Sequence, residues 1–198
     1  FFTAGCSERP LDDEYENPTR PEYYVIIQKG MDWLEGQQRS DGAFVGNDRA
    51  PVDGISQALA GLALTENYLI TGKRKKAAQR ALDYAVRVHQ AGYGGRRSGF
   101  GRTARSSTPD LLTTCLFTLH LRSGNLGKLQ VDEAAFQEIR DFVESMHDEE
   151  AHGFRLARGL KPTVRSTLAG CVTGICLGDL TRSPVPNPRD ARLRAYIP

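Results

Sequence analysis

The chain has 198 residues, of which 39% are hydrophobic and 25% are charged. This composition predicts one domain with a packed core and excludes a generally disordered chain. The net charge is only +2, but the charges are segregated: ten basic residues and one acid lie within 73–105, and eight acids and one arginine lie within 132–150. No apolar run reaches the roughly 18 residues that a membrane-spanning helix requires.

The first segment, residues 1–21, is predicted to be a leader or tether. Small residues precede Cys6 in Phe1-Phe2-Thr3-Ala4-Gly5-Cys6, which resembles the end of a bacterial lipoprotein signal, where that cysteine carries the lipid. The alternative is an arbitrary chain boundary. The first interpretation predicts membrane anchoring through Cys6 in the bacterial cell envelope, and the second leaves a cytoplasmic location open.

Residues 22–180 contain one pattern three times. Each copy has an aspartate followed by an aromatic residue, then a glycine and a phenylalanine, then a proline, and ends near a glycine. The aromatic positions are 51 and 58 residues apart, and the step from the first glycine to the proline is 9, 10 and 9 residues. Such regularity is typical of a repeat architecture. The aromatic and proline positions are Trp33, Tyr84 and Phe142, and Pro51, Pro109 and Pro162.

Each copy is expected to form a helical hairpin, because its apolar residues recur at steps of three and four. In the first helix of the first hairpin this apolar stripe includes Ile26 and Trp33. The three prolines are expected to begin the second helices, and Gly72, Gly124 and Gly178 to end them as left-handed caps.

The predicted fold class is therefore all-α, with six main helices in three hairpins and no strand. The first helix of each pair is richer in charge than the second, which predicts an outer layer of first helices and an inner layer of second helices. Residues 181–198 form a proline-rich tail that is not expected to be helical at its start.

The first copy resembles the QW motif of the α/α-toroid superfamily of terpenoid cyclases and protein prenyltransferases. The motif stands here as Lys29-Gly30-Met31-Asp32-Trp33-Leu34, continuing through Gln37-Gln38 to Asp41-Gly42-Ala43-Phe44. The resemblance implies an α/α-toroid-like array in which the glutamine ties neighbouring outer helices. Because three hairpins give an arc and not a ring, it also implies a protein partner or a homo-oligomer that completes the arc.

The family's catalytic groups are not carried over by this resemblance. The cyclases use an Asp-x-Asp-Asp cluster, and only Leu11-Asp12-Asp13-Glu14, in the leader, is similar to it. Val52-Asp53-Gly54 resembles the prenyltransferase pattern, but Ile55 stands where those enzymes have a zinc-binding cysteine. We therefore expect no catalytic residue, no metal and no cofactor.

Several residues are candidates for ligand binding. A glycine-rich segment after the second outer helix carries four arginines close to the expected helix start at Asp110, and this arrangement suits a diphosphate or a lipid phosphate. The alternative is a solvated loop; nucleic acid is not expected, because aromatic residues for base stacking are scarce. Asp53, Asp110 and Arg165 occupy matching inner-helix starts, which line the cavity in the resembling enzymes; dipole complementation is the alternative for the two aspartates. The four arginines are Arg96, Arg97, Arg102 and Arg105.

The cysteines leave two states open. Cys115 and Cys171 occupy matching inner helices and are expected to approach one another, whereas Cys171 and Cys176 point to different sides of one helix. Free buried thiols are the default, and a disulfide follows only if the protein is exported.

Two functions follow from these patterns. The first is a non-catalytic repeat module that binds a protein partner or an apolar ligand, as part of a larger assembly. The alternative is an isoprenoid-acting enzyme or a fragment of one, in which the inner helices hold the isoprenoid chain and the arginines hold its diphosphate.

Overall fold

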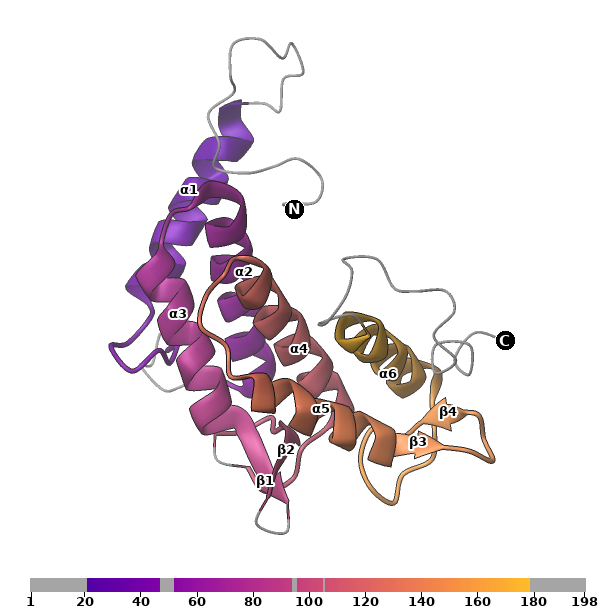
Figure 1. Cartoon of the computed structure of the whole chain (residues 1–198). Coiled ribbons are helices and arrows are strands. Elements are labelled where there is room, and N and C mark those ends of the chain that lie inside the picture. The colour runs from indigo at the N-terminus through magenta and orange to yellow at the C-terminus, as the bar shows by residue number, and fades with distance from the viewer. Residues whose placement is uncertain (1–20, 47–51, 94–95, 105, 179–198) are drawn as a thin grey trace.

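A computed structural model describes residues 21–46, 52–93, 96–104 and 106–178 (Figure 1). The described part is mostly helical, which confirms the all-α prediction at that level, and no helix in it is long and apolar enough to cross a bilayer. The leader, with Cys6, and the tail 181–198 lie outside the described residues, apart from Pro21. The helices are α1 (Pro21–Gly36), α2 (Gly54–Thr71), α3 (Lys75–Tyr84) with the π-helical turn η2 (Ala85–His89), α4 (Leu111–Leu126), α5 (Glu133–Met146) and α6 (Val164–Leu177).

The second helices of the three hairpins pack side by side. Helix α2 packs along α4, and α4 packs along α6, while α3 covers α2 and α4 and α5 covers α4 and α6. One continuous core joins these helices, with Leu64, Leu82, Phe117, Leu121 and Ile139 fully buried in it. The apolar residues of the sequence pattern therefore lie between two sets of helices, one formed by α2, α4 and α6 and the other by α3 and α5.

The prediction that the chain has no strand is wrong. Strand β1 (Gln90–Tyr93) pairs antiparallel with β2 (Arg96–Phe100), and β3 (His147–Asp148) pairs with β4 (Gly153–Phe154). The first hairpin has only an isolated bridge between Gln38 and Phe44 at the matching place. These pairings are too short to produce a period-two pattern that a sequence reading can detect.

The three connections are equivalent in their hydrogen bonds as well as in sequence. The phenylalanine of each connection is buried, and its backbone amide donates to the side chain four residues past the N-cap of the next helix. This shared geometry confirms that the three copies are in phase. The bonds run from Phe44 to Gln57 Oε1 at 2.9 Å, from Phe100 to Thr114 Oγ1 at 2.8 Å, and from Phe154 to Thr167 Oγ1 at 3.1 Å.

The prolines lie just outside the helices that they were expected to begin. Pro109 and Pro162 each precede the N-cap residue, Asp110 or Thr163, and each forms a β-bridge to the preceding connection. Pro51 lies outside the described residues. An N-cap residue accepts hydrogen bonds from the first turn, so the helix starts one residue later than proline placement alone indicates.

The glycines end the helices differently from one another. Gly72 is a left-handed cap with φ 72°, as predicted. Helix α4 continues past Gly124 to Leu126, so the expectation that Gly124 ends it is wrong. Gly178 ends α6 as predicted, but in a right-handed conformation with φ −62° and not as a left-handed cap. Gly124 lies against Leu82, where a Cβ atom would come within 2.6 Å of the leucine Cδ1. It is needed for close packing and not for a turn.

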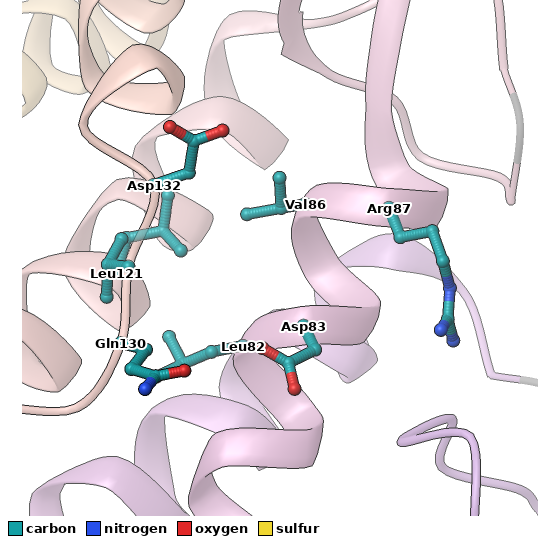
Figure 2. Close-up of a pocket in the computed structure, with 8 residues that line it drawn as sticks. Leu82, Asp83, Val86, Arg87, Leu121, Gln130 and Asp132 are labelled. Atoms are coloured by element: carbon teal, nitrogen blue, oxygen red, sulfur yellow. The ribbon is translucent and has the colours of Figure 1, made fainter.

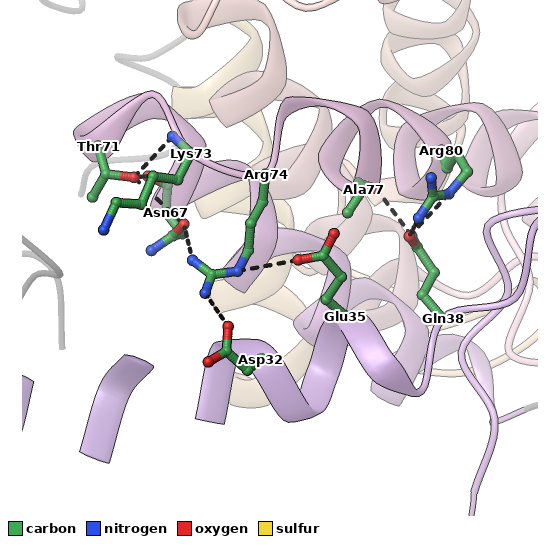
Figure 3. A network of polar contacts seen from close by, with 9 residues as sticks. All are labelled: Asp32, Glu35, Gln38, Asn67, Thr71, Lys73, Arg74, Ala77 and Arg80. Carbon is green, nitrogen blue, oxygen red and sulfur yellow. Dashed lines mark hydrogen bonds and ion pairs between the residues drawn. The ribbon is translucent and has the colours of Figure 1, made fainter. Parts of the chain in front are cut away.

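The glutamine of the QW-like motif does tie neighbouring outer helices. Gln38 Nε2 donates to the Ala77 carbonyl at 3.0 Å, and Arg80 donates to Gln38 Oε1 at 2.8 Å (Figure 3). In the second hairpin Gln90 Nε2 reaches the Ala135 carbonyl, at the corresponding place on α5, at 3.3 Å.

Arg74 makes the second tie between α1 and the next hairpin. It donates to Asp32 at 2.5 Å and to Asn67 Oδ1 at 3.2 Å, and it lies 3.3 Å from Glu35 (Figure 3). The predicted apolar stripe of α1 is partly wrong, because Ile26 and Trp33 are 61% and 58% exposed. Polar contacts therefore replace part of the apolar packing expected at this end of the chain.

Candidate functional site

A row of half-exposed aliphatic side chains lies on the side of α2 and α4 that faces away from α3 and α5. On each of the two helices, the row consists of the second, sixth, ninth and sixteenth residues past the N-cap. At 100° per residue these positions share one side of a helix, opposite the eleventh residues, Leu64 and Leu121, which are fully buried. We call this surface the inner face. It consists of Ile55, Leu59, Leu62 and Leu69 on α2, and Leu112, Leu116, Leu119 and Leu126 on α4.

The two helices that carry the inner face run parallel. Gly61 contacts His120, and Glu66 accepts a hydrogen bond from Ser123, so contacts advance together along both helices. Leu59 and Leu126 are 49% and 50% exposed. The inner face is therefore an aliphatic surface that is in contact with solvent over two adjacent helices.

Asp53, one of the predicted ligand contacts, is the N-cap of α2. Its Oδ1 accepts from the backbone amides of Ile55 at 2.8 Å and Ser56 at 3.2 Å, and its Oδ2 accepts from the Ser56 hydroxyl at 3.0 Å. Burial alone would raise the pKa of Asp53, but these hydrogen bonds and the nearby Arg102 guanidinium hold it below its usual value. The carboxylate is therefore charged and bound to its own helix.

Asp110 has the same role on α4. Its carboxylate accepts from the Thr113 amide at 2.9 Å and from the Thr113 hydroxyl at 2.7 Å. Arg165 is exposed and lies two residues past the N-cap of α6, in register with Ile55 and Leu112 on the other inner helices. The fold thus places Asp53, Asp110 and Arg165 at matching helix starts, as the sequence indicated.

The four arginines of the glycine-rich segment are only partly described. Arg96 and Arg97 belong to β2, Arg102 is exposed, and Arg105 lies outside the described residues. The Arg102 carbonyl accepts from the Gly54 amide at 2.5 Å, which fixes this loop against the start of α2. The described Arg102 side chain is therefore brought close to another candidate, Asp53.

His89 lies beneath this loop and was not singled out as a functional residue. Its ring is buried against Phe117, and its Nδ1 lies 3.2 Å from the Gly101 carbonyl. Burial lowers the pKa of His89, although the Gly101 carbonyl and Asp53 oppose that effect. The neutral ring packs between this loop and the core.

A cavity of about 380 Å³ lies elsewhere, between α3 and the segment that leads into α5 (Figure 2). Asp83 and Asp132 lie on its two sides, while Arg87 turns away and donates to the Asp41 carbonyl at 2.9 Å. None of the predicted ligand residues lines it. The lining residues are Leu82, Asp83, Val86, Arg87, Leu121, Gln130, Val131 and Asp132.

Cys115, Cys171 and Cys176 are free thiols whose pKa values are raised by burial. Cys115 is hydrogen-bonded to the Thr173 side chain of the neighbouring helix α6 and interacts electrostatically with Cys176 of that helix. At 100° per residue, Cys171 lies on a different side of α6 from both of these residues. Within the described ranges, no three histidine, cysteine or acidic side chains are grouped so that they hold a metal ion.

Comparison of the chain with models of known protein families gives no match, and comparison with curated proteins gives none either. The repeat geometry and the inner face are therefore the observations on which a function is argued.

Proposed function

We propose that this chain is a non-catalytic repeat module of the α/α-toroid type whose inner face binds an apolar, isoprenoid-like ligand. The observation that carries the proposal is the solvent-exposed aliphatic row that recurs at matching positions on α2 and α4. A folded domain keeps such positions polar unless something covers them, because exposed contiguous apolar surface promotes aggregation.

The charged groups near the inner face support binding better than catalysis. Asp53 and Asp110 are each engaged by amides and hydroxyls of their own helix, so neither is free to act as a proton donor. Arg102 and Arg165 are exposed at the same end of the inner face, where a cationic side chain suits a phosphate or diphosphate head group. The ligand class is therefore a linear apolar chain with or without an anionic head.

Calorimetric titration of the full chain with farnesol, farnesyl diphosphate and inorganic diphosphate tests this proposal. Leu59→Gln is expected to weaken binding of both farnesyl compounds about fivefold, because it removes roughly 1 kcal/mol of apolar burial. Leu160→Gln is the matched control, since Leu160 is a similarly exposed leucine in the loop before α6. Arg102→Ala is expected to weaken farnesyl diphosphate and leave farnesol unchanged.

Two results contradict the proposal. Absence of binding, or equal losses in Leu59→Gln and Leu160→Gln, removes the inner face as a ligand site. Conversion of farnesyl diphosphate to a new product supports the isoprenoid-acting enzyme instead. Anchoring through Cys6 and a location in the cell envelope stay predictions, which mass spectrometry of the native precursor checks.

A further inference from the structure

The contacts between inner helices use one side of each helix in a fixed register. The first, fifth and eighth residues past the N-cap of α2 are Gly54, Ala58 and Gly61, which share one side of the helix and are all buried. Gly61 contacts His120 of α4, and Gly54 contacts the loop that leads to α4 at Gly101 and Arg102. The same positions of α4 are Leu111, Cys115 and Thr118. All three are buried, and α4 packs along α6. Each inner helix therefore turns this side toward the next inner helix.

On α6 the corresponding side is uncovered. Val164, Leu168, Cys171 and Ile175 occupy the first, fifth, eighth and twelfth positions, and we call them the α6 end face. Val164 is 89%, Leu168 64% and Ile175 49% exposed, whereas Cys171 is half-buried. A groove of about 500 Å³ runs beside these residues from Pro162 to Cys171. On α6, the positions that are buried against the next helix in α2 and α4 are thus apolar as well. No helix in the described part of the chain covers them.

At the opposite end of the row formed by α2, α4 and α6, helix α2 has no preceding inner helix in the described part of the chain. The third, seventh and tenth residues past the N-cap turn toward the preceding inner helix, and on α4 they are Thr113, Phe117 and His120, all fully buried. On α2, the first inner helix, the same positions carry only small side chains, which are half-buried or exposed. These residues, Ser56, Ala60 and Ala63, form the α2 end face.

The sizes of the side chains on the two end faces are complementary. In the α2–α4 contact, Gly61 of α2 lies so close to the His120 ring of α4 that a Cβ atom would come within 2.4 Å of it. In the α4–α6 contact, the Cys115 thiol of α4 is hydrogen-bonded to the Thr173 side chain of α6. The α2–α4 contact joins a large side chain to a small one, and the α6 and α2 end faces are again one large and one small.

We propose that a second copy of this chain packs its α2 end face on the α6 end face, continuing the inner layer from one copy into the next. The contact is heterologous, since it joins opposite ends of the molecule, so copies either close into a ring or extend as an open stack. The inference deepens the proposed function by naming the partner of the repeat module, and it is independent of the ligand.

The register of the α2–α4 contact, applied to the two end faces, gives a pair of positions to test. Position eight of α2, Gly61, meets position ten of α4, His120. Position eight of α6 is Cys171 and position ten of α2 is Ala63, so Cys171 is placed against Ala63 of the second copy. The proposal therefore specifies a pair of positions as well as a pair of faces.

Sedimentation velocity of the full chain over the micromolar range tests the association. Leu168→Glu and Ala60→Arg are each expected to weaken association at least about tenfold, because each buries an unpaired charge. Leu160→Glu is the matched control: Leu160 is a similarly exposed leucine in the loop before α6, outside both end faces and outside the inner face. Circular dichroism of each variant distinguishes lost association from lost folding.

A mixture separates head-to-tail packing from symmetric pairing. Leu168→Glu retains an intact α2 end face and Ala60→Arg retains an intact α6 end face, so the mixture is expected to form a complex of one copy of each. Symmetric pairing of two α6 helices predicts instead that Ala60→Arg associates alone and that the mixture gains nothing. That result overturns the proposal.

Disulfide trapping checks the register. Ala63→Cys, oxidised mildly, is expected to give cross-linked copies on a non-reducing gel, and adding Cys171→Ser is expected to abolish them. Two results would overturn the proposal. One is a wild-type chain that stays monomeric throughout the micromolar range, whatever covers α6 in that monomer. The other is cross-linking that persists after Cys171 is replaced. Farnesol binding by such a monomer would leave the proposed function intact, so the two failures are distinguishable.

Discussion

Protonation of His120 is expected to destabilise the fold as the pH falls. The imidazole is fully buried between α2 and α4, against Gly61 and near Phe117, and neither ring nitrogen has a hydrogen-bond partner among the described residues. Burial lowers the pKa of His120 from 6.5 to about 3. Because the folded-state pKa lies below the unfolded-state value, the stability is fully present above about pH 6.5 and is lost as the pH falls toward 3.

The size of this effect follows from the two pKa values. At about pH 5 the imidazole is almost fully protonated in the unfolded chain and almost fully neutral in the folded one. Linkage then gives a loss of about 2 kcal/mol in the free energy of unfolding between about pH 8 and pH 5. This is a large fraction of the 5–15 kcal/mol that is typical of a domain.

Urea unfolding of the wild type and of His120→Met at these two pH values measures the loss. Methionine has a similar volume and fills irregular space without titrating, so its variant is expected to lose about 2 kcal/mol less than the wild type. Leu121→Met, at a fully buried neighbour on the same helix, controls for repacking and is expected to retain the wild-type pH dependence. Parallel losses in the wild type and His120→Met would refute the reasoning.

Two further changes test the packing and the helix starts. Gly170→Ala is expected to cost about 1–3 kcal/mol, since the new Cβ atom would come within 2.4 Å of the Phe154 ring, whereas Gly174→Ala, on the same helix with open space, should be neutral or stabilising by up to about 1 kcal/mol. A thermal melt that ranks the two variants the other way would contradict the packing of α6. Asp110→Ala should lower the free energy of unfolding in urea by about 1 kcal/mol and Asp110→Asn by less, because the amide oxygen still caps α4; equal losses in both would argue against the cap.

The sequence pattern predicted the helices and their phase because both depend on local spacing. The connecting phenylalanines could be placed in one pattern, and their amides make equivalent hydrogen bonds. The short strand pairs could not be predicted, because strands of two to five residues leave no clear period. The role of Gly124 was also hidden, since it depends on Leu82 of a different helix and not on its own neighbours.

The candidate site shows the same limit. Asp53 and Asp110 were found at their helix starts, because N-caps have a local signature. The leucines of the inner face were visible only as part of one apolar stripe, and the sequence does not say which side of an almost wholly apolar helix is covered. The same helices carry further apolar and small residues outside that stripe. This signal could have indicated that α2 and α4 are packed on more than one side.

The position of α4 between α2 and α6 has a consequence for how the molecule opens. Helix α4 is held from both flanks, whereas α6 is held within the described part of the chain mainly by α4 and α5. In a linear stack each unit depends chiefly on its nearest neighbours, so structural loss begins at the margins and the centre is the last to melt. The first and third hairpins are thus expected to open before α4 loses its helical structure.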